Sequence, residues 1–243
     1  MSLPSPSPSH PPYDWEDDSD CEYTTVPPPA SIERSRVDDI LDEPHQARFC
    51  RAIRNVLYSK PAEFTFAQLV DGLPLENVAH SSVALLFESP VREHETLCPG
   101  AMDKARAFRD SFEPASLDLP IDVIKRYQDI PAGSRASKLP FIELVVVAIH
   151  RIAVLIHKEG SLHKEKEPTF EEDRLCHNWD FGPSPTYYPT PFCLSDYSDP
   201  EQYPDGVANI AGYWAENWIF GGVVVFSRGE SGIEVSCAAL TAR

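Results

Sequence analysis

Residues 141–156 read FIELVVVAIHRIAVLI, and they form the most apolar stretch of the chain. Only Glu143, His150 and Arg151 interrupt the hydrophobic side chains of this stretch. A run of 16 residues with three ionisable groups is too short and too polar to span a bilayer. The pattern therefore predicts a buried central helix over about 141–157, ended at Gly160, with the other helices packed around it.

Shorter helices are predicted on the N-terminal side of the central helix. Apolar residues at helical spacing, with arginines between them, indicate an amphipathic helix over 46–58. Thr65 begins a capping-box pattern and Gly72 is a helix stop, which bounds a short helix around residues 66–70. Further helices are predicted over 75–88, where a strand is the alternative, over 101–112, and from Pro120 onwards.

The C-terminal segment has the pattern of β-structure. Residues 218–226 are rich in β-branched and aromatic side chains, and apolar residues alternate with polar ones over 233–237. The intervening residues 227–232 contain two glycines, so the segment predicts a β-hairpin. The predicted fold class is α+β: one mostly helical domain over 45–243 around the central helix, with a small C-terminal hairpin or sheet.

Negative charge is concentrated in two stretches of a chain whose net charge is −17. Residues 1–44 hold 11 acidic and 2 basic residues, net −9, and residues 163–207 hold 10 and 3, net −7. Both stretches are also rich in proline. We expect 1–44 to be a disordered acidic tail, and 163–207 to be an irregular aromatic-rich loop lying over the domain. The chain lacks a cluster of Lys and Arg, so nucleic acid is not an expected partner.

The first residues do not resemble a targeting signal. A secretory signal needs a basic start and an apolar core, and a mitochondrial presequence is rich in arginine and poor in acids. We therefore expect a protein of the cytoplasm or the nucleus, without a membrane partner. Six cysteines without close pairing fit free thiols in such a compartment.

His150 is the first candidate site residue, together with Glu143 or Arg151 on the same helix. Glu143, His150 and His157 recur every seven residues, so they share one helix face. Seven residues rise about 10.5 Å, which is too far for two of these side chains to share one small ion. Two interpretations remain: a catalytic pocket lined by His150, or polar groups that are hydrogen-bonded within a helical core.

The string Gly212-Tyr213-Trp214-Ala215-Glu216-Asn217-Trp218 is the second candidate. Tyr213, Trp214, Glu216 and Trp218 could line an apolar ligand-binding pocket with a few polar groups. Alternatively, these bulky side chains form the hinge that packs the hairpin onto the helices.

Standard motifs for metals and cofactors are missing, so neither is expected. The residues His163, Cys176, His177 and Cys193 lack the paired short spacings of a zinc site. Gly221-Gly222 matches no phosphate-binding loop, and Gly229-Glu230-Ser231-Gly232 lacks the spacing of a hydrolase nucleophile elbow.

The segments Gly212–Glu216 and Ile219–Phe226, with Leu139–Leu144 and the acidic tail, resemble a group of filamentous-fungal proteins without an assigned activity. The resemblance covers about the last 110 residues and implies no catalytic residue. Members of that group continue past the hairpin, which raises the alternative of a truncated or differently spliced C-terminus in this chain.

Two functions follow as hypotheses. The first is a non-catalytic protein-interaction protein whose acidic-aromatic block, Tyr13–Tyr23, docks on a protein partner. The second is an accessory enzyme or binding protein for a small, largely apolar metabolite, held between the central helix and residues 213–218. A deep pocket around His150 or Trp214 with Glu216 would favour the second, and a filled core would favour the first. The oligomeric state does not follow from the sequence.

Overall fold

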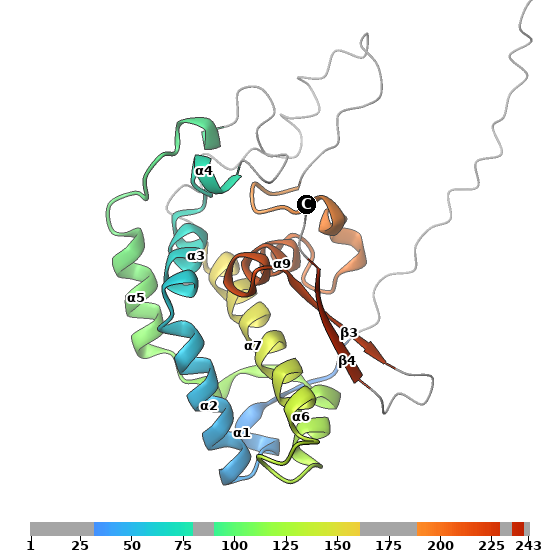
Figure 1. Cartoon of the computed structure of the whole chain (residues 1–243). Coiled ribbons are helices and arrows are strands. Elements are labelled where there is room, and N and C mark those ends of the chain that lie inside the picture. Colours follow the sequence, from blue (N-terminus) through green and yellow to red (C-terminus); the bar gives the residue numbers. More distant parts are fainter. Residues whose placement is uncertain (1–31, 80–89, 161–188, 229–234, 241–243) are drawn as a thin grey trace, which may run out of the picture.

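Helix α7 (Lys138–Glu159) runs through the middle of the fold, and other helices pack around it (Figure 1). The computed structural model describes residues 32–79, 90–160, 189–228 and 235–240. The other helices are α1 (Val37–Ile40), α2 (Glu43–Leu57), α3 (Lys60–Asp71), α4 (Glu76–Ala79), α5 (Ala101–Ser111), α6 (Ile121–Gln128) and α9 (Val207–Phe220). The described residues also form four short 3₁₀ turns: η2 (Pro90–Glu93), η3 (Pro114–Ser116), η5 (Ser195–Tyr197) and η6 (Pro200–Gln202).

Two antiparallel strand pairs complete the described part of the chain. Strand β1 (Arg34–Arg36) pairs with β2 (Asp118–Pro120), and β3 (Val223–Arg228) pairs with β4 (Val235–Leu240). The register of the second pair places Val223 opposite Leu240 and Arg228 opposite Val235. The mostly helical α+β fold around one apolar helix is thereby confirmed.

The central helix is longer than the apolar run that predicted it. It spans 22 residues, and Gly160, with φ of 92°, follows its last turn as expected. By length and hydropathy alone α7 could cross a membrane, so the expectation that the apolar helix is too short and too polar to span a bilayer is wrong. More than half of its most apolar window is buried by the rest of the protein, and it contacts α2, α3, α6 and α9. This is the packing of a core helix.

Aromatic side chains from four parts of the fold fill the core beside α7. Phe49 of α2, Tyr127 of α6 and Trp214 of α9 are fully or almost fully buried. Phe192 lies in the segment expected to be an irregular loop, and it is equally buried against Trp214. Residues 192–194 of that segment therefore belong to the core.

The expected tail boundary at residue 44 differs from the structure. Residues 34–44 contain β1, α1 and the beginning of α2, and the Val37 side chain is fully buried. The Val37 N–H donates to the Leu117 carbonyl at 3.1 Å, next to the β1–β2 pair. Charge and proline content suggested disorder here, but long-range pairing and the burial of Val37 order the segment. Residues 1–31 lie outside the described residues.

Two other expected boundaries differ from the structure, at the starts of β3 and of α3. Trp218, Ile219 and Phe220 were assigned to a strand, but they form the last turn of α9. Gly221 follows with φ of 78°, and β3 begins only at Val223. Of the helix expected over 75–88, the structure shows the first turn, α4, and residues 80–89 lie outside the described part of the chain. Gly72 ends α3 with φ of 95°, as expected, but the capping box expected at Thr65 is wrong, because α3 begins at Lys60 with Ser59 as its N-cap.

Candidate functional site

His150 and Glu216, which belonged to different candidate sites in the sequence, are direct partners. His150 Nδ1 lies 2.7 Å from Glu216 Oε1, and Asn209 Nδ2 lies 2.9 Å from His150 Nε2. The contact links α7 to α9, which pack closely against each other. Gly212 makes this packing possible, since a Cβ at that position would lie 2.6 Å from His150 Cε1.

The hydrogen bonds assign the proton on the imidazole ring. The Asp205 backbone N–H donates to Asn209 Oδ1 at 2.7 Å, so the amide oxygen is committed and the NH₂ group faces His150. His150 Nε2 therefore accepts, and Nδ1–H donates to the Glu216 carboxylate. Both ring nitrogens are used within the protein. The arrangement holds α7 against α9 and offers no free nitrogen for acid–base chemistry.

Glu143 and Arg151 do not join His150 but pair with other elements. Glu143 is buried, and its Oε1 accepts from Arg126 Nη2 of α6 at 2.8 Å. Arg151 Nη1 donates to Asp205 Oδ2 at 3.2 Å. The three polar residues of the apolar run thus each pair with a different group, which fits the interpretation of hydrogen-bonded core groups.

The Asp205 carboxylate pairs with three cations from different parts of the chain. It accepts hydrogen bonds from Arg34 at 2.7 Å, from Arg151 and from Lys158 at 2.5 Å. Burial alone would raise the pKa of Asp205, but the hydrogen bonds from Lys158 and Arg34 and the charge of Arg151 outweigh it and lower the pKa to about 2. This cluster connects β1, α7 and the segment before α9.

The aromatic residues of α9 are packed into the core. Trp214 is fully buried, with its ring centroid 4.8 Å from that of Phe192 and 6.3 Å from that of Trp218. Tyr213 lies edge-on to His150 at 4.6 Å and stacks on Tyr197 at 4.5 Å. Burial raises the pKa of the Tyr213 phenol well above its usual range.

Glu216 also connects α9 to the strand that follows it. Its Oε2 accepts from the Val224 N–H at 3.3 Å, while Oε1 binds His150. Together with the packing of Trp214, this is the arrangement expected of a hinge that fixes the β3–β4 pair on the helices.

Of the thiol and histidine candidates on the aromatic loop, Cys193 is described. It is buried, its S–H donates to the Leu194 carbonyl at 3.5 Å, and burial raises the pKa of the thiol to about 12. Such a thiol is a poor nucleophile and a poor metal ligand at neutral pH. His163, Cys176, His177 and the Gly229–Gly232 turn lie outside the described residues.

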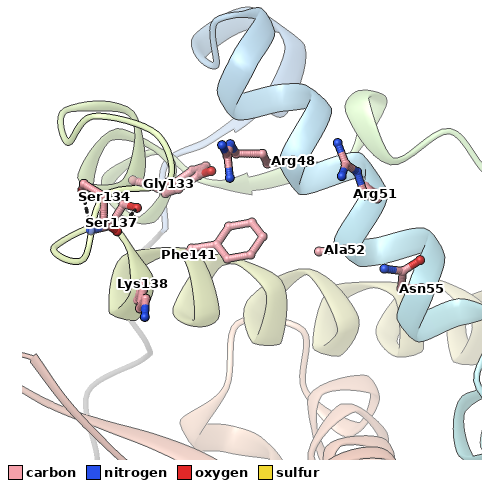
Figure 2. Close-up of a pocket in the computed structure, with 10 residues that line it drawn as sticks. Arg48, Arg51, Ala52, Asn55, Gly133, Ser134, Ser137, Lys138 and Phe141 are labelled. Atoms are coloured by element: carbon pink, nitrogen blue, oxygen red, sulfur yellow. Dashed lines mark hydrogen bonds between the residues drawn. The ribbon is translucent and has the colours of Figure 1, made fainter.

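A hollow of about 360 Å³ opens between α2 and the beginning of α7 (Figure 2). We call it the cationic pocket. Its wall and floor consist of Arg48, Arg51, Ala52 and Asn55 of α2, Tyr127 of α6, the turn residues Gly133, Ser134 and Ser137, and Lys138 and Phe141 of α7.

Three cations line the cationic pocket without an acidic partner. Arg48, Arg51 and Lys138 are exposed and form no ion pair with any residue that the structure describes. Other arginines do pair: Arg54, on the same helix as Arg51, lies 3.4 Å from Glu113. The first turn of α7 also borders the hollow and adds the positive end of a 22-residue helix. The pocket is thus a site of positive potential on an acidic protein.

The floor and the turn fix the shape of the pocket. The rings of Tyr127 and Phe141 lie 5.1 Å apart and give an apolar base. Ser137 N–H donates to Ser134 Oγ at 3.1 Å, and Ser137 Oγ donates to the Ser134 carbonyl at 2.9 Å (Figure 2). Gly133 has φ of 77° and no side chain, which lets the Arg48 guanidinium lie directly over the turn.

The cationic pocket was not predicted from the sequence. Arg48, Arg51 and Asn55 are spaced i, i+3 and i+7, so they share one face of α2, and this spacing was the available signal. The opposite wall comes from residues more than 75 positions further along the chain. Only the packing of α2 against α7 brings the two walls together.

Comparison with known proteins gives no assignment: no family model, no curated protein and no solved structure matches the chain.

Proposed function

We propose that the protein is a non-catalytic interaction protein that binds an acidic peptide segment of a protein partner in the cationic pocket. The observation that carries the proposal is a set of three cations over an aromatic floor, none of which forms an ion pair with a described residue, in a chain of net charge −17. Unpaired arginines bind carboxylates through two parallel hydrogen bonds, and an apolar floor accepts an aromatic side chain of the same segment.

The spacing of the donors favours a peptide over a small anion. Arg48, Arg51 and Asn55 lie along seven residues of α2, which is about 10.5 Å of helix. An extended peptide rises about 3.3 Å per residue, so about three residues cover this distance. A single phosphate or carboxylate would reach only part of the row. The volume of about 360 Å³ lies at the lower end for ligand pockets, and it suits one aromatic anchor.

The interior hydrogen bonds support a role without catalysis. His150, the best candidate for acid–base chemistry, has both ring nitrogens bonded to Glu216 and Asn209. The space between α7 and residues 213–218, where a small apolar metabolite was the alternative, contains the packed rings of His150, Tyr213 and Trp214. We therefore favour the interaction protein over the metabolite-binding protein, and we propose the cytoplasm or the nucleus as its location.

The test is a titration of the full-length protein with a fluorescently labelled peptide of the sequence Tyr13–Tyr23, which supplies acids and aromatic rings. We expect saturable binding that weakens with salt. Arg48→Ala and Arg51→Ala should each weaken it roughly tenfold, the effect of losing a charged partner in a docked pair. Arg54→Ala is the matched control on the same helix, since Arg54 already pairs with Glu113.

Three results would overturn the proposal. The first is no saturable binding of the peptide. The second is equal affinity for a peptide in which Asn and Gln replace its acids. The third is an unlabelled small anion, inorganic phosphate or glutamate, that displaces the peptide at a concentration equal to that of the peptide itself.

A further inference from the structure

Asp71, His94 and Cys98 form a cluster that the proposed function does not use. Asp71 is the last residue of α3, His94 follows η2, and Cys98 precedes α5. One potential ligand atom from each residue lies within 4.8 Å of those from the other two. Asp71 is fully buried, His94 is buried and Cys98 is half-buried. Three different donor types thus converge on one small volume.

The position of Asp71 is unfavourable for the helix that carries it. The C-terminus of a helix carries a partial negative charge, which a carboxylate in the last turn opposes. Asp71 is also out of contact with water, where a charge needs compensation. Its Oδ2 accepts from the Cys98 N–H at 2.8 Å and lies 3.1 Å from His94 Nε2. Asp71 therefore connects the end of α3 to His94 and Cys98 rather than stabilising α3 itself.

The three residues are held in place by separate backbone contacts. The Glu76 N–H of α4 donates to the His94 carbonyl at 2.9 Å, and the His94 N–H donates to the Val91 carbonyl at 3.1 Å. The Ala101 N–H at the start of α5 donates to the Cys98 carbonyl at 3.1 Å. The cluster is thus preorganised by α3, α4 and α5.

We propose that Asp71, His94 and Cys98 bind a zinc ion through three protein ligands, with the fourth position open. Oxygen, nitrogen and sulfur donors together suit zinc, whereas calcium and magnesium require oxygen ligands only. In a tetrahedral zinc site an oxygen and a nitrogen ligand lie about 3.3 Å apart, from bond lengths near 2.05 Å. The Asp71–His94 distance of 3.1 Å is close to that value. The Cys98 thiol loses its proton to solvent when the Zn–S bond forms.

The same residue types could instead form a Cys–His–Asp nucleophilic relay, and the distances decide against it. In a relay the imidazole stands between the carboxylate and the sulfur, which separates them by roughly 6 Å or more. Here all three ligand atoms lie within 4.8 Å of one another, so they surround a common point. In the sequence, His94 and Cys98 stand only four residues apart, but the third ligand, Asp71, lies 23 positions before His94 and belongs to no short zinc motif.

The experiment uses the full-length protein without a metal-binding tag, loaded separately with zinc chloride and cobalt chloride. We expect one equivalent of zinc by elemental analysis, and a thiolate-to-cobalt charge-transfer band in the near ultraviolet. Cys98→Ser should abolish the band, and His94→Gln should weaken zinc binding by more than about tenfold to a hundredfold, the range for losing a residue that only supports a ligand. Cys50→Ser, at a buried thiol of α2, is the control that keeps both signals.

Far-ultraviolet circular dichroism of Cys98→Ser separates loss of the ligand from loss of the fold. A wild-type protein with far less than one equivalent of zinc and no cobalt band would overturn the site. So would a cobalt band that persists at full intensity in a folded Cys98→Ser protein. Neither result depends on the cationic pocket, which contains none of the three residues.

Discussion

His150 Nδ1 donates a 2.7 Å hydrogen bond to Glu216 Oε1, across 66 positions of sequence. Because Asn209 occupies the other ring nitrogen, we expect His150→Ala to act on stability alone. The change leaves the buried Glu216 carboxylate without its imidazole partner, which should lower the free energy of unfolding by about 1–3 kcal/mol. Urea denaturation measures this loss. Affinity for the Tyr13–Tyr23 peptide should stay within about twofold of wild type, because His150 does not line the cationic pocket and distant sites affect each other by no more than that.

Glu159→Ala is the control for that change, since Glu159 is an exposed residue at the end of the same helix. A His150→Ala protein of unchanged stability that no longer binds the peptide would contradict both the structural role of His150 and the assignment of the binding site.

Gly212→Ala should be destabilising because its new Cβ would lie 2.6 Å from His150 Cε1. The imidazole is held by two hydrogen bonds, so it cannot move aside without losing them. We expect a loss of about 1–3 kcal/mol in the free energy of unfolding, the usual cost of overpacking. In a His150→Ala background the ring is gone, and the same substitution should cost almost nothing. Urea denaturation of the four proteins gives the coupling directly, and additive losses would contradict the contact.

The ion pairs of Asp205 should make the free energy of unfolding fall in acid, where the carboxylate becomes protonated. Its pKa falls from 3.8 to about 2 because Lys158, Arg34 and Arg151 stabilise the carboxylate more than burial penalises it. The stabilisation is complete above pH 4 and disappears as the pH falls from 4 towards 2. Asp205→Asn should therefore be less stable than wild type at pH 7, by at most about 2 kcal/mol on the basis of the pKa difference.

Urea denaturation of both proteins between pH 7 and pH 2 tests this expectation, and the difference should shrink as the pH falls below 4. Asp129→Asn is the control, since Asp129 is exposed and no side-chain bond to it is found in the described part of the chain. A difference that stays constant down to pH 2 would show that the charge of Asp205 is not what stabilises the cluster.

Gly133→Ala should affect the cationic pocket as well as stability. The added Cβ would lie 2.7 Å from Arg48 Nη2, so the guanidinium must move away from the turn. Positive φ adds about 1–2 kcal/mol of strain for a residue other than glycine. Gly221→Ala is a close control, because Gly221 has φ of 78° and nothing within 4 Å of its would-be Cβ. Both proteins should lose similar stability, and only Gly133→Ala should bind the Tyr13–Tyr23 peptide more weakly.

Local sequence patterns predicted most helices and the hairpin. Contacts between distant residues determined several element boundaries and the order of residues 34–44, which no local pattern showed. The apolar run at 141–156 and the stops at Gly72 and Gly160 gave the central helix and two of the helix ends correctly. Trp218–Phe220 have side chains typical of strands, yet they extend α9, because this helix buries its apolar side against α7. Residues 34–44 looked like a solvated tail until the pairing of β1 with β2 and the burial of Val37 were known.

The candidate residues illustrate the same limit. His150, Glu143 and Arg151 were grouped because they lie on one helix, but their partners are Glu216, Arg126 and Asp205 on other elements. Helical spacing predicts which side of a helix a side chain lies on. Its hydrogen-bond partner depends on which other segment packs against that side. The two walls of the cationic pocket come from separate parts of the chain for the same reason.

The Arg34–Asp205 ion pair joins residues 171 positions apart, and this sequence separation affects when the chain can fold during translation. A ribosome adds about 5–20 residues per second, so Asp205 is synthesised roughly 10–30 s after Arg34. Helix α7 is synthesised before α9, so the face of α7 that α9 covers stays exposed until residues 207–220 have been made. High sequence separation between contacts slows folding. Chaperones that bind this apolar face during translation should therefore raise the yield of folded protein.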